Sequence, residues 1–202
     1  MPSDADNIID LYERNAQYYV ADRRGVGWDE RPWLDRFIAL LPQGAPILDI
    51  GCGSGEPIAR YLIDLNYPLD GVDTSPTLIA VCRERFPKHR WHVADMRNLT
   101  LGKTFGGILA WDSLFHLSHD DQRRMFAIFK RHAASSAALM FTSGTSHGVA
   151  IGSYHGEPLY HASLAPEEYR ALLAANGFRV EAHVSEDPNC GRHTIWLAQA
   201  VR

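Results

Sequence analysis

Apolar positions along the chain follow two different spacings, and the change between them divides the chain into parts. Residues 4–19 and 32–41 carry apolar side chains three or four positions apart, which predicts two helices. From Pro46 onward, short apolar runs alternate with helical patterns. The predicted strands are 47–51, 68–73, 91–94, 105–111 and 137–142, and the predicted helices are 57–66, 75–86 and 118–132. Strands that alternate with helices predict a mostly parallel sheet covered by helices on both faces.

The pattern changes after residue 143. Residues 144–163 are rich in Gly, His and Tyr without clear periodicity, which predicts a long loop of the kind that is usually functional. A helix over 166–176 follows, ended by Gly177 at the position where helices commonly end. The last two apolar runs, 178–184 and 193–200, predict an antiparallel strand pair.

Composition limits the chain to one domain and to a small partner. At 202 residues and 46% hydrophobic composition, residues 1–202 are expected to form a single domain. A net charge of −4 without a long basic block argues against nucleic acid as a partner. No apolar run approaches the roughly 20 residues that span a bilayer, and the acidic N-terminus is unlike a signal peptide. Three cysteines without a CxxC pair are expected to be reduced, so a cytoplasmic location is expected.

A glycine-rich segment, GCGSGE at 51–56, lies between a predicted strand and a predicted helix. Glycines allow a sharp turn and a close approach of the backbone to a ligand, although an ordinary strand-to-helix turn has the same composition. A dinucleotide-binding fingerprint would place glycine, and a pyrophosphate, where this chain has Glu56. A carboxylate repels phosphate and suits a cofactor that carries an ammonium and a sulfonium. Asp49 adds a second carboxylate that could attract the ammonium.

Two further aspartates follow the next predicted strands. Asp73 ends the second strand, where a carboxylate can accept both hydroxyls of a ribose. Asp95 follows the third strand, and it could accept from an adenine amino group while Met96 packs on the ring. Each aspartate alone could instead cap a helix or lie in a solvated loop.

These motifs resemble those of the class I S-adenosylmethionine-dependent methyltransferases. LDIGCGSG is similar to their first motif, GVDTS to the ribose motif, VADM to the adenine motif, and FGGILAWDSLFHL to the strand and loop at the methionine end. The resemblance implies an α/β, Rossmann-like, doubly wound fold of three αβα layers, with a mostly parallel seven-stranded sheet and an antiparallel edge. It implies S-adenosyl-L-methionine as cofactor, S-adenosyl-L-homocysteine as product, and residues 1–44 as a helical cap over the cofactor. The residues expected to bind the cofactor are Tyr19, Asp49, Gly51, Cys52, Gly53, Asp73, Thr74, Ser75, Asp95, Met96, Ala110 and Trp111.

Methyl transfer from a sulfonium is an in-line displacement, which needs a base only when the nucleophile is protonated. Asp112 and His116 follow the fourth predicted strand on the cofactor side and are the candidate bases, although His116 could simply pack at the next helix. The spacing of the histidines matches no metal-binding pattern, so no metal is expected. Cys190 and His193 are close enough to suggest a nucleophile, but methyl transfer requires none. The candidate substrate-binding residues are Trp28, His147, Tyr154, His155 and Tyr160, most of them in the 144–163 loop.

The predicted function is methyl transfer to a small-molecule acceptor. AWDS stands at 110–113, where enzymes that methylate exocyclic base or amide nitrogens carry an NPPY-type tetrapeptide. Two alternatives stay open at this stage. One is a non-catalytic S-adenosylmethionine-binding protein, and the other is a nicotinamide-dependent oxidoreductase, which Glu56 disfavours.

Overall fold

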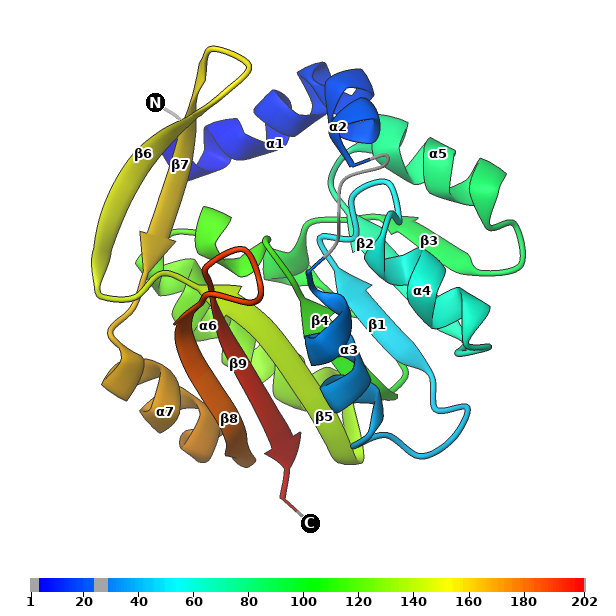
Figure 1. Ribbon diagram of the computed structural model, residues 1–202, viewed down its shortest axis with the longest axis vertical. Coiled ribbons are helices and arrows are strands. Elements are labelled where there is room, and N and C mark those ends of the chain that lie inside the picture. Colours follow the sequence, from blue (N-terminus) through cyan, green and yellow to red (C-terminus); the bar gives the residue numbers. More distant parts are fainter. Residues whose placement is uncertain (1–3, 24–28, 202) are drawn as a thin grey trace.

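The computed structural model describes residues 4–23 and 29–201, and a seven-stranded sheet runs through its centre (Figure 1). The strands are β1 (Ile47–Ile50), β2 (Leu69–Asp73), β3 (Arg90–Val93), β4 (Phe105–Ala110), β5 (Ala133–Ser143), β8 (Phe178–Asp187) and β9 (His193–Ala200). Their order is β3-β2-β1-β4-β5-β9-β8. The first five strands pair in parallel, and β9 pairs antiparallel with both β5 and β8. The predicted mostly parallel sheet with an antiparallel edge is confirmed.

The strand order reverses direction at β1. From β1 the chain proceeds outward through β2 and β3, then returns to β4 on the other side of β1 and continues to β5. The loops that leave β1 and β4 therefore diverge at one edge of the sheet and leave a crevice between them. In open α/β sheets, ligands bind at such a point.

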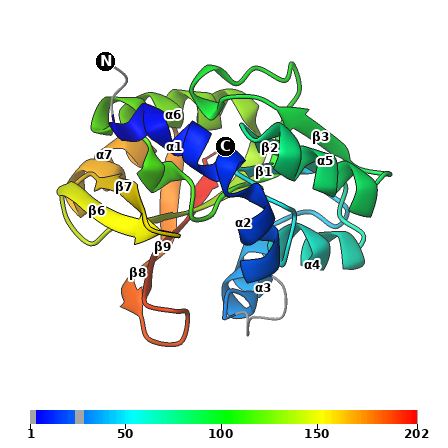
Figure 2. The same ribbon diagram turned by 90° about the horizontal axis from the view of Figure 1, so that it is seen from above.

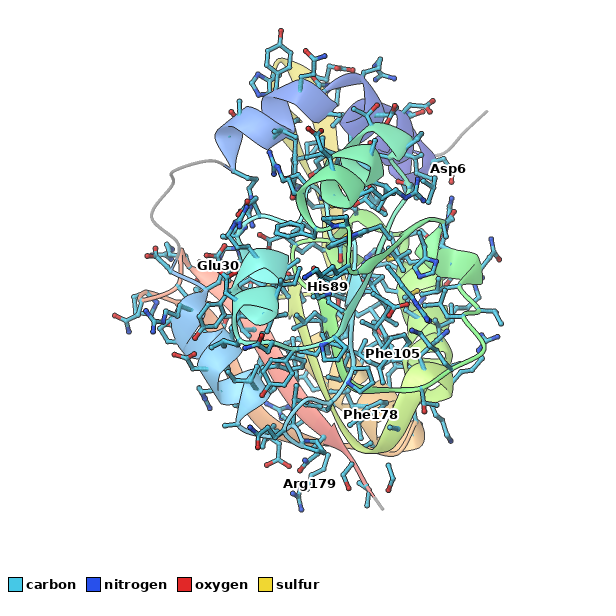
Figure 3. All side chains as sticks on the ribbon, turned by 90° about the vertical axis from the view of Figure 1, so that its right-hand side faces the viewer. Asp6, Glu30, His89, Phe105, Phe178 and Arg179 are labelled. Carbon is cyan, nitrogen blue, oxygen red and sulfur yellow. The ribbon has the colours of Figure 1, made fainter. Side chains whose placement is uncertain are left out.

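Helices cover both faces of the sheet, as Figure 2 shows from above. One face carries α3 (Arg31–Ile38), α4 (Ile58–Asp64) and α5 (Pro76–Arg85), and the other carries α6 (His119–His132) and α7 (Pro166–Ala175). Alternate strand residues face opposite sides. Ile47 and Leu109 therefore pack against the first layer of helices (α3, α4 and α5), while Leu48 and Ile108 pack against the second (α6 and α7). Phe105, labelled in Figure 3, is fully buried in the second layer. The three-layer αβα prediction is confirmed.

The N-terminal segment forms α1 (Asp4–Arg14) and α2 (Ala16–Asp22) instead of the single helix predicted over 4–19. The break is at Asn15, whose side-chain amide donates to the Leu11 carbonyl at 3.0 Å and to Glu157 at 2.7 Å. An amide that satisfies neighbouring groups in this way competes with a continuous helix. Figure 1 shows α1 and α2 above the upper edge of the sheet, whereas α3 packs on its face. The predicted cap comprised residues 1–44. Within the described residues, only α1 and α2 of this segment lie above the edge of the sheet.

The prediction of a long loop at 144–163 is wrong, because the segment forms a hairpin of β6 (Gly148–Tyr154) and β7 (Glu157–Ser163). Its two-residue turn, His155-Gly156, has positive φ at both positions, as tight hairpin turns require. Most of β6 is exposed, including 55% of Val149 and 55% of Ile151. A strand with solvent on both faces needs no apolar–polar alternation, so its sequence lacks the usual signal.

No helix within residues 4–23 or 29–201 has both the length and the apolar character needed to cross a membrane.

Candidate active site

A cavity lies at the carboxyl ends of β1 and β2, under α1 and α2. Its walls include much of the predicted cofactor site and several apolar residues of α1 and α5, among them Ile8 and Leu78. The predicted cofactor-binding residues that line it are Tyr19, Gly51, Gly53, Asp73, Thr74, Asp95 and Met96. We call it the first cavity.

The glycine loop after β1 leaves no room for side chains. Gly51 and Gly53 have φ values of 78° and 53°, which favour glycine. A Cβ on Gly53 would lie 2.5 Å from the Tyr19 hydroxyl, and a Cβ on Gly51 would lie 2.3 Å from the Cβ of Ser113. The backbone of the loop is therefore exposed directly to the cavity and to the side chains that close it.

Asp73, at the end of β2, holds the glycine loop and the start of α5 together. Its two oxygens accept from the backbone N–H groups of Gly53 and Ser75, each at 2.9 Å. Burial raises the pKa of Asp73, and these hydrogen bonds oppose the rise. Ser75 caps α5 by accepting from the N–H of Leu78, and its hydroxyl donates to Glu13 of α1. Ser75 thus connects the loop to the cap without lining the cavity.

Asp95 caps the short helix Met96–Asn98 by accepting from the Arg97 N–H at 2.9 Å. It also pairs with the Arg97 guanidinium at 2.6 Å, and Arg97 reaches Asp6 of α1 at the same distance. Figure 3 labels Asp6 beside the first helix. The capping alternative therefore describes part of what Asp95 does, and its contact with an adenine stays a prediction.

Four other predicted cofactor residues lie behind the cavity wall. Asp49 is 3% exposed, and burial raises the pKa of its carboxyl to about 7, with a further rise from Asp73 and a smaller opposing effect of Arg23. Cys52 is buried among the side chains of α4 and α5. Ala110 faces the layer of α6, and the Trp111 ring packs 5.3 Å from His193. None of these four residues lines the first cavity, and their contact with the cofactor stays a prediction.

A second cavity lies on the other side of three residues that also line the first: Tyr12, Asp112 and His116. Its other walls come from Phe115, from Ser143 at the end of β5, from His161 of the hairpin and from residues 191–194 at the start of β9. Tyr12 was not predicted as a site residue, His161 belongs to the 144–163 segment predicted to line the substrate pocket, and His193 was considered only as part of a nucleophile that methyl transfer does not need. One signal was available for Tyr12, because Tyr12 and Tyr19 are two helical turns apart and so share a face. Tyr18, by contrast, is 56% exposed and stacks on His155.

His116 is held in one tautomer at this shared wall. Its Nδ1 lies 2.9 Å from the carbonyl oxygen of Tyr160, which can only accept, so Nδ1 carries the hydrogen. Its Nε2 lies 3.0 Å from the Tyr12 hydroxyl and accepts from it. Burial lowers the pKa of His116 to about 4, so the ring is neutral near pH 7.

The residues predicted to bind substrate are mostly elsewhere. His147 is exposed and stacks on His119 at 4.3 Å, away from both cavities. Tyr154 and His155 both contact Asp22 of α2 at 3.0 Å, so they join the hairpin turn to the cap. Tyr160 contributes its carbonyl to His116, and Trp28 lies outside the described residues. In the described part of the chain, no three His, Cys, Asp or Glu side chains are grouped to hold a metal.

Comparison with known proteins agrees with this geometry. Residues 47–136 match the family model of a methyltransferase domain. A curated relative, dTDP-3-amino-3,6-dideoxy-alpha-D-glucopyranose N,N-dimethyltransferase from Streptomyces fradiae, is 33% identical over 124 residues, 59% of this chain and 48% of its own. This chain thus spans about half of that relative's length.

Two solved structures share the fold. The Burkholderia thailandensis 1,6-didemethyltoxoflavin-N1-methyltransferase has a TM-score of 0.75 at 18% identity, covering 100% of this chain and 92% of its own. An amino pentose methyltransferase from Micromonospora echinaspora has a TM-score of 0.71 at 21% identity, covering 92% of this chain and 96% of its own. Residues 47–136 thus match a methyltransferase domain, and the chain shares its fold with these two methyltransferases.

Proposed function

We propose that this protein transfers a methyl group from S-adenosylmethionine to a small-molecule acceptor, with the cofactor in the first cavity and the acceptor in the second. One observation carries the proposal: the two cavities share the wall of Tyr12, Asp112 and His116. In-line transfer needs two ligands that meet at one point, held in position and away from water.

The first cavity suits the charges of S-adenosylmethionine. Arg23 lines it, with one terminal nitrogen 3.6 Å from Glu30, and its buried Nε has no hydrogen-bond partner in the described structure, which fits a carboxylate ligand. We assign Asp73 to the ribose hydroxyls, and Asp95 with Met96 to the adenine. Arg97, the other described arginine of the lining, is already paired with Asp95 and Asp6.

The same charges argue against a dinucleotide. Glu56, at the position of the pyrophosphate in a nicotinamide enzyme, pairs with Arg60 at 2.6 Å. The side chain of Glu56 thus occupies the position at which the dinucleotide fingerprint needs a glycine beside the pyrophosphate.

When bound, the cofactor supplies an electrophilic methyl group, and the residues of the shared wall position the acceptor and its proton. Tyr12 is held by its hydrogen bond to His116, which fixes the phenol between the cavities. A pKa of about 4 makes His116 a weak base near neutrality, so we assign it the role of orienting Tyr12. Asp112 is then the group at the wall that accepts a hydrogen bond, and finally the proton, from an N–H or O–H nucleophile.

The second cavity suits a polar, uncharged acceptor of modest size. His116 and His161 both have a pKa lowered by burial, so they offer neutral hydrogen-bonding groups, as does Ser143. The relative from Streptomyces fradiae is named for an amino sugar substrate and the structure from Micromonospora echinaspora for an amino pentose. We therefore propose an amino- or hydroxyl-bearing sugar-sized acceptor, and not a nucleic acid. Three buried free cysteines suit the reducing cytoplasm in which we place the protein.

Calorimetry with S-adenosylhomocysteine, followed by a panel of amino sugars and hydroxylated aromatics with radiolabelled methyl donor, tests the proposal. Arg23→Ala and Asp73→Asn should each weaken S-adenosylhomocysteine binding by about 10-fold or more, because each loses a charged hydrogen bond. Asp120→Asn is the matched control, since this exposed carboxylate lies outside both cavities. Cofactor binding without transfer to any acceptor would favour a non-catalytic binding protein, and binding of NADH instead would overturn the proposal.

A further inference from the structure

His193, the first residue of β9, lies in a turn that is held from several sides. The backbone carbonyl of Asp187 accepts from the N–H groups of Cys190 and Arg192 at 3.0 and 2.9 Å. The Asp187 carboxylate accepts from the indole of Trp33 at 2.8 Å, which fastens the turn to α3. Packing of His193 against the Trp111 ring completes this support. The imidazole is thus presented to the second cavity by a built turn and not by a free loop end.

The ring of His193 faces two acceptors. Its Nδ1 lies 2.8 Å from the carbonyl oxygen of Cys190, and its Nε2 lies 3.0 Å from Oδ2 of Asp112. A carbonyl oxygen and a carboxylate both accept, so both contacts are satisfied only by the doubly protonated imidazolium. In agreement, the hydrogen bond with Asp112 raises the pKa of His193 to about 9 against the opposing effect of burial.

Asp112 is fixed from the opposite side as well. It has a φ of 46°, a left-handed conformation that aspartate tolerates better than most residues. Its N–H donates to the Thr142 hydroxyl at 2.8 Å, and that hydroxyl donates to Oδ1 at 3.2 Å. With Thr142 on one oxygen and His193 on the other, the carboxylate keeps lone pairs directed at the cavities that it lines.

We propose that His193 is the positioning residue that holds the Asp112 carboxylate ready to accept a hydrogen bond from the N–H or O–H nucleophile of the acceptor. This inference rests on the proposed function. It makes the turn between β8 and β9, which lies outside the matched methyltransferase domain at 47–136, part of the acceptor site. Cys190 does not act as a nucleophile or base, because burial raises the pKa of its thiol to about 12.

The His193–Asp112 ion pair holds the main charged groups at this end of the second cavity. Glu30, before α3, acts on His193 in the same direction as Asp112, and Arg192 pairs with Glu186 at 2.8 Å. His161 and His116 face Asp112 from the hairpin and from the loop after β4, and both are neutral. The Tyr12 phenol, on α1, is neutral too, since burial raises its pKa. An acceptor that enters the cavity thus meets the Asp112 carboxylate as part of an ion pair whose net charge is zero.

Titration of His193 by NMR tests the ion pair without any acceptor. In the S-adenosylhomocysteine complex, the His193 ring should titrate near pH 9, with its signal assigned by its loss in His193→Gln. Asp112→Asn should return the titration to near the ordinary histidine value of about 6.5. Asp120→Asn, the matched control, should leave it unchanged. A wild-type His193 that titrates near 6.5 would overturn the inference.

Kinetics then separate positioning from a merely structural effect. With an acceptor from the panel, His193→Gln should raise the acceptor KM by about 10-fold and leave S-adenosylhomocysteine affinity within about twofold, because the residue touches only the second cavity. Since His193 acts through Asp112, the double variant with Asp112→Asn should be no slower than Asp112→Asn alone.

Each remaining outcome has one meaning. Additive losses in the double variant, or a loss of cofactor affinity in His193→Gln, would overturn the inference. A normal ion pair with no methylated acceptor would instead show that the proposed function fails, and the positioning role with it.

Discussion

The two cavities that meet at Tyr12, Asp112 and His116 differ in how much of their lining is backbone and how much is side chain. One wall of the first is backbone, with glycines that have no space for a Cβ and a carboxylate fixed by main-chain N–H groups, while side chains of α1, α2 and α5 form the rest. The second has walls of side chains, in which neutral histidines, a paired imidazolium and small hydroxyl residues meet from four separate segments. A wall of backbone permits almost no substitution, whereas a wall of side chains can change its chemistry one residue at a time. We therefore expect the first cavity to be intolerant of change and the second to be adjustable.

The largest effect is expected at Gly51. Gly51→Ala would place a Cβ 2.3 Å from Ser113 at a φ of 78°, so the loop must move. Steric strain of this kind costs roughly 2–4 kcal/mol, and S-adenosylhomocysteine affinity should fall by about 100-fold in calorimetry. Gly102→Ala is the matched control, with a similar φ of 66° but open space around the new methyl group. If both variants bound equally well, the first cavity would not depend on close backbone approach.

Next in size is the pH dependence produced by Asp49. The folded pKa of about 7 is raised above the usual value, so the stability that this group contributes is present in acid and lost as pH rises toward 7. Without ligand, wild-type stability should therefore fall by about 2 kcal/mol more than that of Asp49→Asn between pH 5 and pH 7. Urea unfolding at both pH values measures this difference. Parallel curves would show that Asp49 is ionised in the folded protein and that the first cavity already stabilises the charge.

At the shared wall, Tyr12→Phe should lower kcat/KM by about 10-fold, because it leaves the buried Nε2 of His116 without a donor. Methyl-transfer kinetics measure the change. Tyr18→Phe serves as control, since Tyr18 is exposed and lies on the outer face of α2. Equal rates for both variants would remove Tyr12 from the boundary between the cavities.

The smallest effect is expected at the contact between the hairpin and the cap. Glu157 accepts from Arg14 at 2.6 Å and from Asn15 at 2.7 Å. Glu157 and Arg14 are exposed side chains, where ion pairs contribute little, so Glu157→Gln should loosen the cap only slightly. Amide exchange in α1 should become a few-fold faster, as seen by mass spectrometry. Glu181→Gln, which breaks the exposed pair with Arg179, should leave α1 unaffected. Unchanged exchange in Glu157→Gln would show that other contacts hold the cap.

The difference between the cavities also explains what the sequence could predict. The glycine loop, Asp73 and Asp95 each directly follow a parallel strand, so local patterns place them at one edge of the sheet. Ala110 and Trp111 do not line the first cavity, and the sequence could not show this, because which residues at the end of β4 face the cavity depends on the helices packed around them. The position of His193 could not be predicted, because the approach of the β9 turn to Asp112, 81 residues away, is a tertiary contact. The hairpin was missed because β6, which is mostly exposed, lacks an apolar period.

The first helix contacts three loops at once. Asp6 reaches Arg97 beside the third strand, Glu13 reaches Ser75 and Thr77 after the second, and Arg14 with Asn15 reaches Glu157 of the hairpin. An insertion or deletion in any one of these loops would put the other two contacts out of register. In a lineage of such proteins, new length should therefore accumulate where the helix makes no contact. In this chain one such place is the connection between β5 and β6, at residues 144–147.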